Sequence, residues 1–134
     1  GKYLNKYDDY SAIVFDAFKK GRQAIIENCS KVRDEQAQII KETLSKVVVT
    51  RAESYLRDAA ADDDLTAEYF HALSEGYGFI LSLQFTYTAD GTPYFSNAEV
   101  NTMLATLEAG NGFWDRTDAE LIQMADAINE VSGL

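Results

Sequence analysis

The sequence predicts an all-α fold, an antiparallel helical bundle of about five helices that forms a single helical domain over residues 1–134. One proline, Pro93, interrupts the chain, and proline is the residue that helix interiors tolerate least. Apolar residues recur at i, i+3, i+4 and i+7 over long stretches, which is the period of an amphipathic helix. Two segments, 96–99 and 117–120, have the Ser/Thr-x-x-Glu pattern that begins helices.

The first helix is expected over about residues 8–27. Asp8, Asp9 and Ser11 supply capping oxygens and negative charge at its start, which suits the positive end of the helix dipole. The segment 28–30 then breaks the helix. The residues expected on its inner face share the helical period: Tyr10, Ile13, Val14, Ala17, Phe18, Gly21 and Ile25.

The second helix is expected from about Lys31 to Ala61, with Ser30 as its N-cap. The β-branched run 47–50 resembles a strand, but we assign it to the helix because the helical period continues on both sides of it. The residues expected to face inward form a main stripe and a flank: Ala37, Ile40, Leu44, Val47, Val48, Tyr55 and Ala59, with Ile39, Ala52 and Leu56.

The third helix, about residues 65–85, is the most apolar, and we therefore expect it in the centre of the bundle. Asp64 or Thr66 is its expected N-cap. Gly76 and Gly78 each cost a helix about 1 kcal/mol relative to alanine. We expect these glycines at a close contact with a neighbouring helix or a ligand.

Two shorter helices complete the chain. The segment 88–93 contains Asp-Gly followed by Thr-Pro and predicts a turn. The capping boxes then begin a helix that ends near Leu107 and a last helix after Thr117, with a Gly-Asn-Gly break at 110–112. The last helix is expected to face inward through Leu121, Ile122, Ala125 and Ile128.

Composition excludes several classes of function. The 22 Asp and Glu against 12 Lys and Arg give a net charge of −10, which repels nucleic-acid phosphates and anionic lipids, so we predict no nucleic-acid partner. Apolar residues make up 46% of the chain, as in a folded domain rather than a disordered one. The single cysteine, Cys29, excludes an internal disulfide.

The candidate chemical site is the pair His71 and Glu75, whose i, i+4 spacing places both side chains on one helix face. An imidazole and a carboxylate can supply two ligands to a transition metal or act as an acid–base pair. The remaining ligands would come from other helices, and the identity of any metal or other cofactor stays open. The alternative is an ordinary pair on the helix surface.

Aromatic residues outside the helices suggest two further contacts. Trp114, in the Gly-rich break, can line a ligand pocket, or it can close the end of the bundle with its indole N–H bonded to backbone. Tyr3, Tyr7 and Tyr10 recur at helical spacing. This spacing predicts a packing seam with a preceding portion of the protein.

A buried ion pair between Arg51 and Glu75 is also predicted. Arg51 interrupts the apolar stripe of the second helix, and Glu75 is the one acid between residues 69 and 89. Isolated buried charges are costly, and arginine can serve a carboxylate through two parallel N–H bonds. In the alternative arrangement, Arg51 extends along its own helix and Glu75 points to solvent.

Three segments carry a family resemblance: QAQII at 36–40, HALSEGYGFI at 71–80 and NGFWD at 111–115. They resemble the C-terminal half of a bacterial family of domains of unknown function, family 4856. The resemblance implies one half of a larger, imelysin-like helical envelope protein, of a kind linked to iron acquisition. Imelysins carry a Gly-x-His-x-x-Glu motif. Here Tyr69 stands two residues before His71 and Glu75 four residues after it, so that motif is not matched.

The leading functional prediction is a non-enzymatic, envelope-associated protein that binds a small ligand, a metal complex or a partner, with His71, Glu75 and Trp114 as candidate binding residues. The resemblance implies a periplasmic or outer-membrane-associated location and an N-terminal lipid anchor as membrane tether. It also implies a partner that is the N-terminal half of the same protein or another envelope protein. The alternatives are a metal-dependent hydrolase completed by that half, and a purely structural interaction domain.

Overall fold

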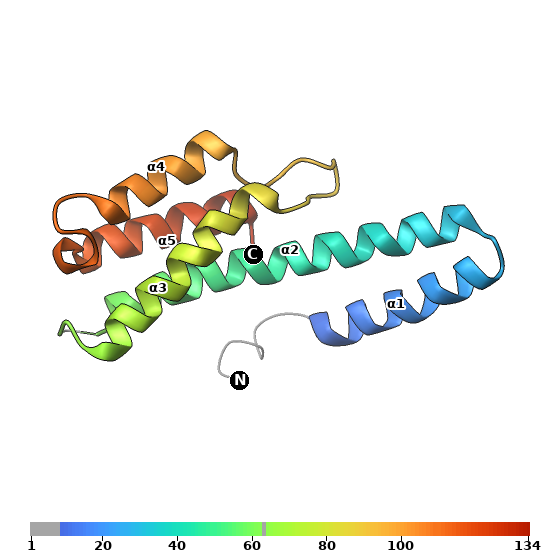
Figure 1. The fold of residues 1–134 in the computed structure, drawn as a ribbon, viewed down its shortest axis with the longest axis horizontal. Coiled ribbons are helices and arrows are strands. Elements are labelled where there is room, and N and C mark those ends of the chain that lie inside the picture. The colour runs from blue at the N-terminus through green and yellow to red at the C-terminus, as the bar shows by residue number, and fades with distance from the viewer. Residues whose placement is uncertain (1–8, 63) are drawn as a thin grey trace.

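The computed structural model describes residues 9–62 and 64–134, and it confirms the all-α bundle over this part of the chain (Figure 1). The predicted contacts of Tyr3 and Tyr7 and the capping role of Asp8 lie outside the described residues. Within these described ranges, five α-helices are joined by turns and two short 3₁₀ helices: α1 (Tyr10–Ile26), α2 (Ser30–Ala60), α3 (Ala67–Ser82), η1 (Leu83–Phe85), α4 (Asn97–Glu108), η2 (Gly112–Asp115) and α5 (Asp118–Ser132).

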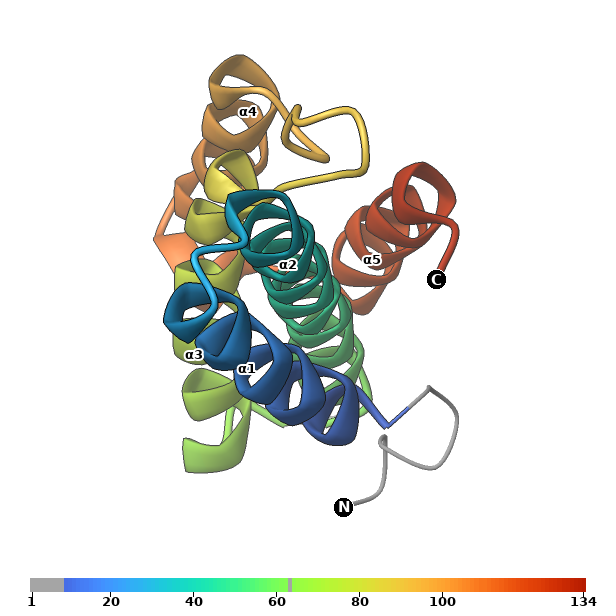
Figure 2. The ribbon, with the colours of Figure 1, turned by 90° about the vertical axis from the view of Figure 1, so that its right-hand side faces the viewer.

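The 31-residue helix α2 is the spine of the fold. It packs against α3 and α5, while α4 packs against α3 (Figure 2). The first half of α2 projects from these helices and runs antiparallel to α1 (Figure 1). We call residues 9–50 the hairpin and residues 51–134 the bundle.

The hydrophobic core lies almost entirely in the bundle. Its buried members begin at Val49, and α1 contributes none of those in the described ranges. Fully burying a leucine or isoleucine contributes about 1.5–3 kcal/mol, so the bundle holds most of the apolar stabilisation. The largest fully buried side chains come from four helices and η1: Val49, Leu56, Leu73, Ile80, Leu83, Val100, Leu107, Leu121 and Ile128.

Short-range signals place most helix starts as predicted. Each capping side chain accepts a hydrogen bond from a backbone N–H of the first turn, which satisfies a donor that the helix itself cannot pair. Both capping boxes are complete, with the glutamate side chain bonded back to the cap residue. The caps of α1, α3, α4 and α5 are Asp9, Thr66, Ser96 and Thr117.

The start of α2 differs from the prediction by one residue. Ser30 is already helical, and Cys29 occupies the cap position without a side-chain hydrogen bond. Asn28 adopts a left-handed conformation with a φ of 56°, and the N–H of Cys29 bonds to the carbonyl of Ala24. The left-handed residue and this hydrogen bond end α1 as a helix C-cap does, so that α2 begins one residue earlier than predicted.

The two glycines of α3 have different surroundings. A Cβ added to Gly76 would lie 3.3 Å from the Cβ of Tyr55 on α2, so the predicted close helix contact is confirmed there. A Cβ on Gly78 would meet nothing within 4 Å, and the prediction is wrong for this residue. Side chains two positions apart in an α-helix point in directions about 200° apart. Gly78 therefore faces away from α2, which Gly76 contacts.

Candidate functional site

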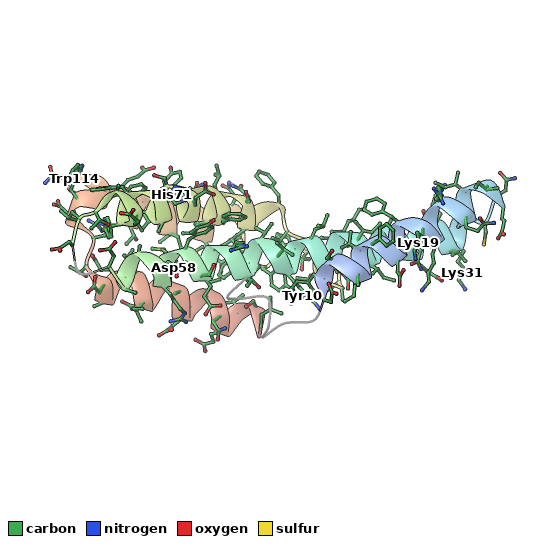
Figure 3. The ribbon with its side chains drawn as sticks, turned by 90° about the horizontal axis from the view of Figure 1, so that it is seen from below. Tyr10, Lys19, Lys31, Asp58, His71 and Trp114 are labelled. Atoms are coloured by element: carbon green, nitrogen blue, oxygen red, sulfur yellow. The ribbon has the colours of Figure 1, made fainter. Side chains whose placement is uncertain are left out.

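His71 and Glu75 are both exposed on the outer side of α3. His71 lies at the end of the molecule opposite to Lys19 and Lys31 of the hairpin (Figure 3). Within residues 9–62 and 64–134, no cluster of three or more His, Cys, Asp or Glu side chains could hold a metal ion. The described part of the chain thus brings no further ligand to this pair.

The predicted ion pair between Arg51 and Glu75 is not formed in the structure, which is a correction. The guanidinium carbon of Arg51 instead lies 6.0 Å from the centroid of the Tyr55 ring on its own helix, and Tyr55 stacks on Phe79 of α3. Glu75 is exposed. Because Glu75 keeps its hydration and Arg51 is only partly buried, the desolvation penalty that would have favoured their pairing is small. The alternative, with Arg51 extended along α2, is the arrangement observed.

Trp114 does not close the end of the bundle. It is 62% exposed, and its ring packs on Phe70 with centroids 4.3 Å apart. The buried Tyr69 lies at this end instead, and its hydroxyl donates a 2.8 Å hydrogen bond to the carbonyl of Phe113. Burial raises the pKa of Tyr69, so the phenol stays a neutral donor.

Arg116 is a residue whose role the sequence did not reveal. Its side chain is only 6% exposed. It donates hydrogen bonds to three carbonyl oxygens, those of Thr106, Ala109 and Gly112, and so ties the end of α4 to η2. Its position after a Gly-rich break is the one available signal, because loops beyond a helix end leave carbonyls that need donors.

An apolar hollow lies between the two helices of the hairpin. It has a volume of about 400 Å³. Its walls hold large side chains that remain exposed: Phe15 is 64% exposed, Phe18 59% and Leu44 48%. We call it the hairpin groove, and its lining residues are Tyr10, Ser11, Val14, Phe15, Phe18, Leu44 and Val47.

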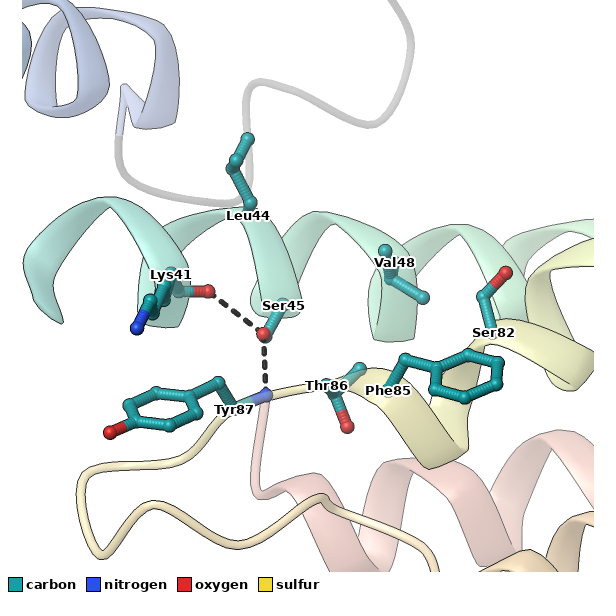
Figure 4. Close-up of a pocket in the computed structure, with 8 residues that line it drawn as sticks. All are labelled: Lys41, Leu44, Ser45, Val48, Ser82, Phe85, Thr86 and Tyr87. Atoms are coloured by element: carbon teal, nitrogen blue, oxygen red, sulfur yellow. Dashed lines mark hydrogen bonds between the residues drawn. The ribbon is translucent and has the colours of Figure 1, made fainter. Parts of the chain in front are cut away.

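A second hollow lies where the hairpin meets the bundle, and Leu44 lines both. In the close-up, Leu44 points away from Ser45 and Tyr87 (Figure 4). The hydroxyl of Ser45 donates to the carbonyl of Lys41 at 2.8 Å and accepts from the N–H of Tyr87 at 2.7 Å. These bonds fix the chain after η1 onto α2. Phe85, 78% exposed, stands at the edge of this hollow.

The hairpin groove exists because α1 packs on α2 through small residues. Ala17 and Ala24 are buried. A Cβ added to Gly21 would lie 3.5 Å from the Cβ of Gln36 on α2. Successive residues point in directions about 100° apart around a helix. Phe18 and Ile25, which directly follow Ala17 and Ala24, therefore lie beside the contact with α2. The predicted inner face of α1 is therefore wrong for Ile13, Phe18 and Ile25, which are exposed, whereas Tyr10 is buried as predicted. On α2, likewise, Leu44 is exposed while the predicted flank residues Ala52 and Leu56 are buried.

Charge is divided unevenly along the chain. Residues 1–50 contain nine Lys or Arg and seven Asp or Glu, whereas residues 51–134 contain three and fifteen. At the rim of the groove, Lys19 lies 2.7 Å from the carboxylate of Asp16 and over the ring of Phe15. The hydrogen bond from Lys19 lowers the pKa of Asp16. The groove is thus set in a surface of nearly balanced charge, beside a strongly acidic bundle.

Comparisons with known proteins identify the family. No helix in the described ranges combines the length and apolar character that crossing a bilayer requires. No curated protein and no solved structure matches the chain. One family model, described as a domain of unknown function (DUF4856), matches residues 2–134. Because the match covers nearly the whole sequence, the chain belongs to the DUF4856 family.

Proposed function

We propose that this domain is a non-enzymatic binding module whose hairpin groove receives an apolar segment of another polypeptide. The observation that carries the proposal is the exposure of Phe15, Phe18 and Leu44 around one groove. Soluble domains rarely expose contiguous apolar patches unless the patch binds something. A groove between two helices suits a helical segment, whose residues at i, i+3, i+4 and i+7 fill it.

The lining favours a polypeptide over a small ligand. Small-molecule sites place a few polar groups so that they converge on the ligand. In the hairpin groove, the lining residues that carry a polar side-chain group are Ser11 and Tyr10. In the neighbouring hollow, the hydroxyl of Ser45 is already engaged by two backbone groups. The walls of the groove therefore offer an extended apolar contact, which suits a polypeptide better than a small ligand.

The proposal keeps the cellular setting that the family resemblance implies. The module would belong to an envelope-associated, imelysin-like protein linked to iron or nutrient acquisition, and its partner would be a helical segment of that protein or of another envelope protein. The metal-dependent hydrolase is not favoured by any observation on the described residues, because His71 and Glu75 are exposed without further ligands nearby.

Site-specific photo-crosslinking tests the proposal. A benzophenone amino acid is placed at Phe18 in the groove and, as the control, at the exposed His71 on the far end of the molecule. In cells that make the protein, we expect an adduct at position 18 in which mass spectrometry locates a polypeptide on the groove, and none at position 71. Equal yields at both positions, or none at position 18, would contradict a binding role for the groove.

A further inference from the structure

We infer that the polypeptide received by the hairpin groove is the same groove of a second copy, so that two hairpins pair about a two-fold axis into a four-helix unit. This inference rests on the proposed function and specifies its partner. It is supported by three features of the described residues: the shape of the groove face, the distribution of charge and the apolar area that is exposed.

The groove face carries both halves of a self-complementary contact. Phe15 and Phe18 form a ridge on α1 at i and i+3, and the groove wall opposite them is formed by Leu44 and Val47 of α2. In a two-fold interface, a residue that contacts a second residue on the partner receives the reciprocal contact. The ridge of one copy can therefore lie against the α2 wall of the other, and the same contact closes on the opposite side of the axis.

Charge determines which surfaces of two copies can meet. The whole chain has a net charge of −10, so two copies repel each other at most orientations. The bundle has three basic and fifteen acidic residues, whereas residues 9–50 have seven basic and six acidic. Contact through the hairpins brings together the two nearly neutral surfaces. Contact through the bundles would bring together two strongly acidic ones.

The exposed apolar area is sufficient to contribute a large part of such an interface. An aromatic side chain covers about 150–250 Å², so Phe15 and Phe18, each about three-fifths exposed, leave roughly 250 Å² of apolar surface on each copy. Ile25 and Leu44 are 62% and 48% exposed and raise the total to roughly half of the ~800 Å² that each partner buries in a standard interface.

Analytical ultracentrifugation of the intact chain tests the inference. We expect a monomer–dimer equilibrium with a dissociation constant in the micromolar range, roughly 1–50 µM. Phe18→Ser and Leu44→Ser should each weaken dimerisation at least about tenfold, which is the effect of losing one well-packed apolar contact. Phe85→Ser is the control, because this side chain is more exposed than either but lies outside the hairpin groove, and it should leave the dissociation constant unchanged. Circular dichroism verifies that each variant is folded.

Salt supplies an independent measurement. Raising ionic strength from about 50 mM to about 500 mM shortens the range of repulsion between the acidic bundles, so the dimer should tighten. A protein that stays monomeric at about 200 µM, that loosens with salt, or that assembles beyond dimers would overturn the inference. If the crosslink at position 18 then contains a different polypeptide, the proposed function stands and the second copy is rejected. If position 18 gives no adduct, both fail.

Discussion

Replacing each of the two glycines of α3 by alanine separates the effect of helix propensity on stability from the effect of packing. Gly76 and Gly78 lie in the interior of the same helix. A Cβ at position 76 would stand 3.3 Å from the Cβ of Tyr55 and 4.0 Å from the backbone nitrogen of Leu56, whereas a Cβ at position 78 meets nothing within 4 Å. Gly76→Ala and Gly78→Ala therefore share the gain in propensity and differ in what the new methyl group touches.

The magnitudes follow from these surroundings. Replacing glycine by alanine in a helix interior is worth about 0.8–1.0 kcal/mol, so Gly78→Ala should raise the free energy of unfolding by about that amount. Ordinary carbon contacts are about 3.5–4.0 Å, and the Cβ of Tyr55 is attached to a helix whose next residue, Leu56, is fully buried. Gly76→Ala should therefore raise the free energy of unfolding by less than Gly78→Ala does. Gly76→Leu pushes three more carbons toward α2, and overpacking of this kind costs about 1–3 kcal/mol.

Urea unfolding followed by far-UV circular dichroism measures all three variants. The expected order of unfolding free energies is Gly78→Ala above Gly76→Ala, with Gly76→Leu below the natural protein. The slope of free energy against urea should stay constant, since the surface exposed on unfolding hardly changes. Equal stabilisation by the two alanines, or an unchanged midpoint for Gly76→Leu, would show that α2 and α3 are not in close contact at Gly76.

Three further predictions concern the caps and the loop after α4. Ser96→Ala removes the side-chain acceptor of the α4 capping box and should lower the free energy of unfolding by about 1 kcal/mol; an unchanged urea midpoint would show that the cap is dispensable. The hydrogen bonds from Thr117 lower the pKa of Glu120 below its ordinary value of 4.5, so the stability they contribute is present above pH 4.5 and is lost as pH falls through the pKa of the folded protein. Glu120→Gln should therefore flatten the fall of melting temperature with pH in that acidic range, and parallel curves would contradict the assignment. Arg116→Met leaves the carbonyl of Gly112 without its donor and removes one of the two donors to the carbonyls of Thr106 and Ala109, so it should cost about 1–3 kcal/mol, whereas a melting temperature equal to the natural one would mean that water replaces the guanidinium without loss.

The sequence predicts helix starts well where the signal is local. The bonds that begin α4 join Ser96 and Glu99, three residues apart, so the pattern alone contains the whole interaction. The run 47–49 is helical as expected, because a sustained helical period outweighs the strand preference of three valines. Such interactions need no knowledge of what packs against the helix.

The candidate site was harder to predict, because periodicity finds an apolar face without saying what covers it. Phe18 and Ile25 follow the same period as Ala17 and Gly21 on α1, yet the small residues contact α2 and the large ones flank the contact. Arg51 illustrates the same difficulty for charge. Its place in an apolar stripe suggests burial, but a long side chain can lie along apolar surface and still bring its charged end to water.

The exposed apolar residues and the balanced charge coincide in one part of the chain, and that coincidence carries the functional argument. Of the fourteen large apolar side chains that are exposed among the described residues, eight lie in the hairpin, although the bundle is about twice as long. A net charge far from zero keeps protein surfaces apart, and the bundle has that protection while the hairpin lacks it. A hairpin that served only to extend the fold would gain from acidic residues at positions 15, 18 and 44. Phenylalanine and leucine at these positions fit the proposed surface for another polypeptide.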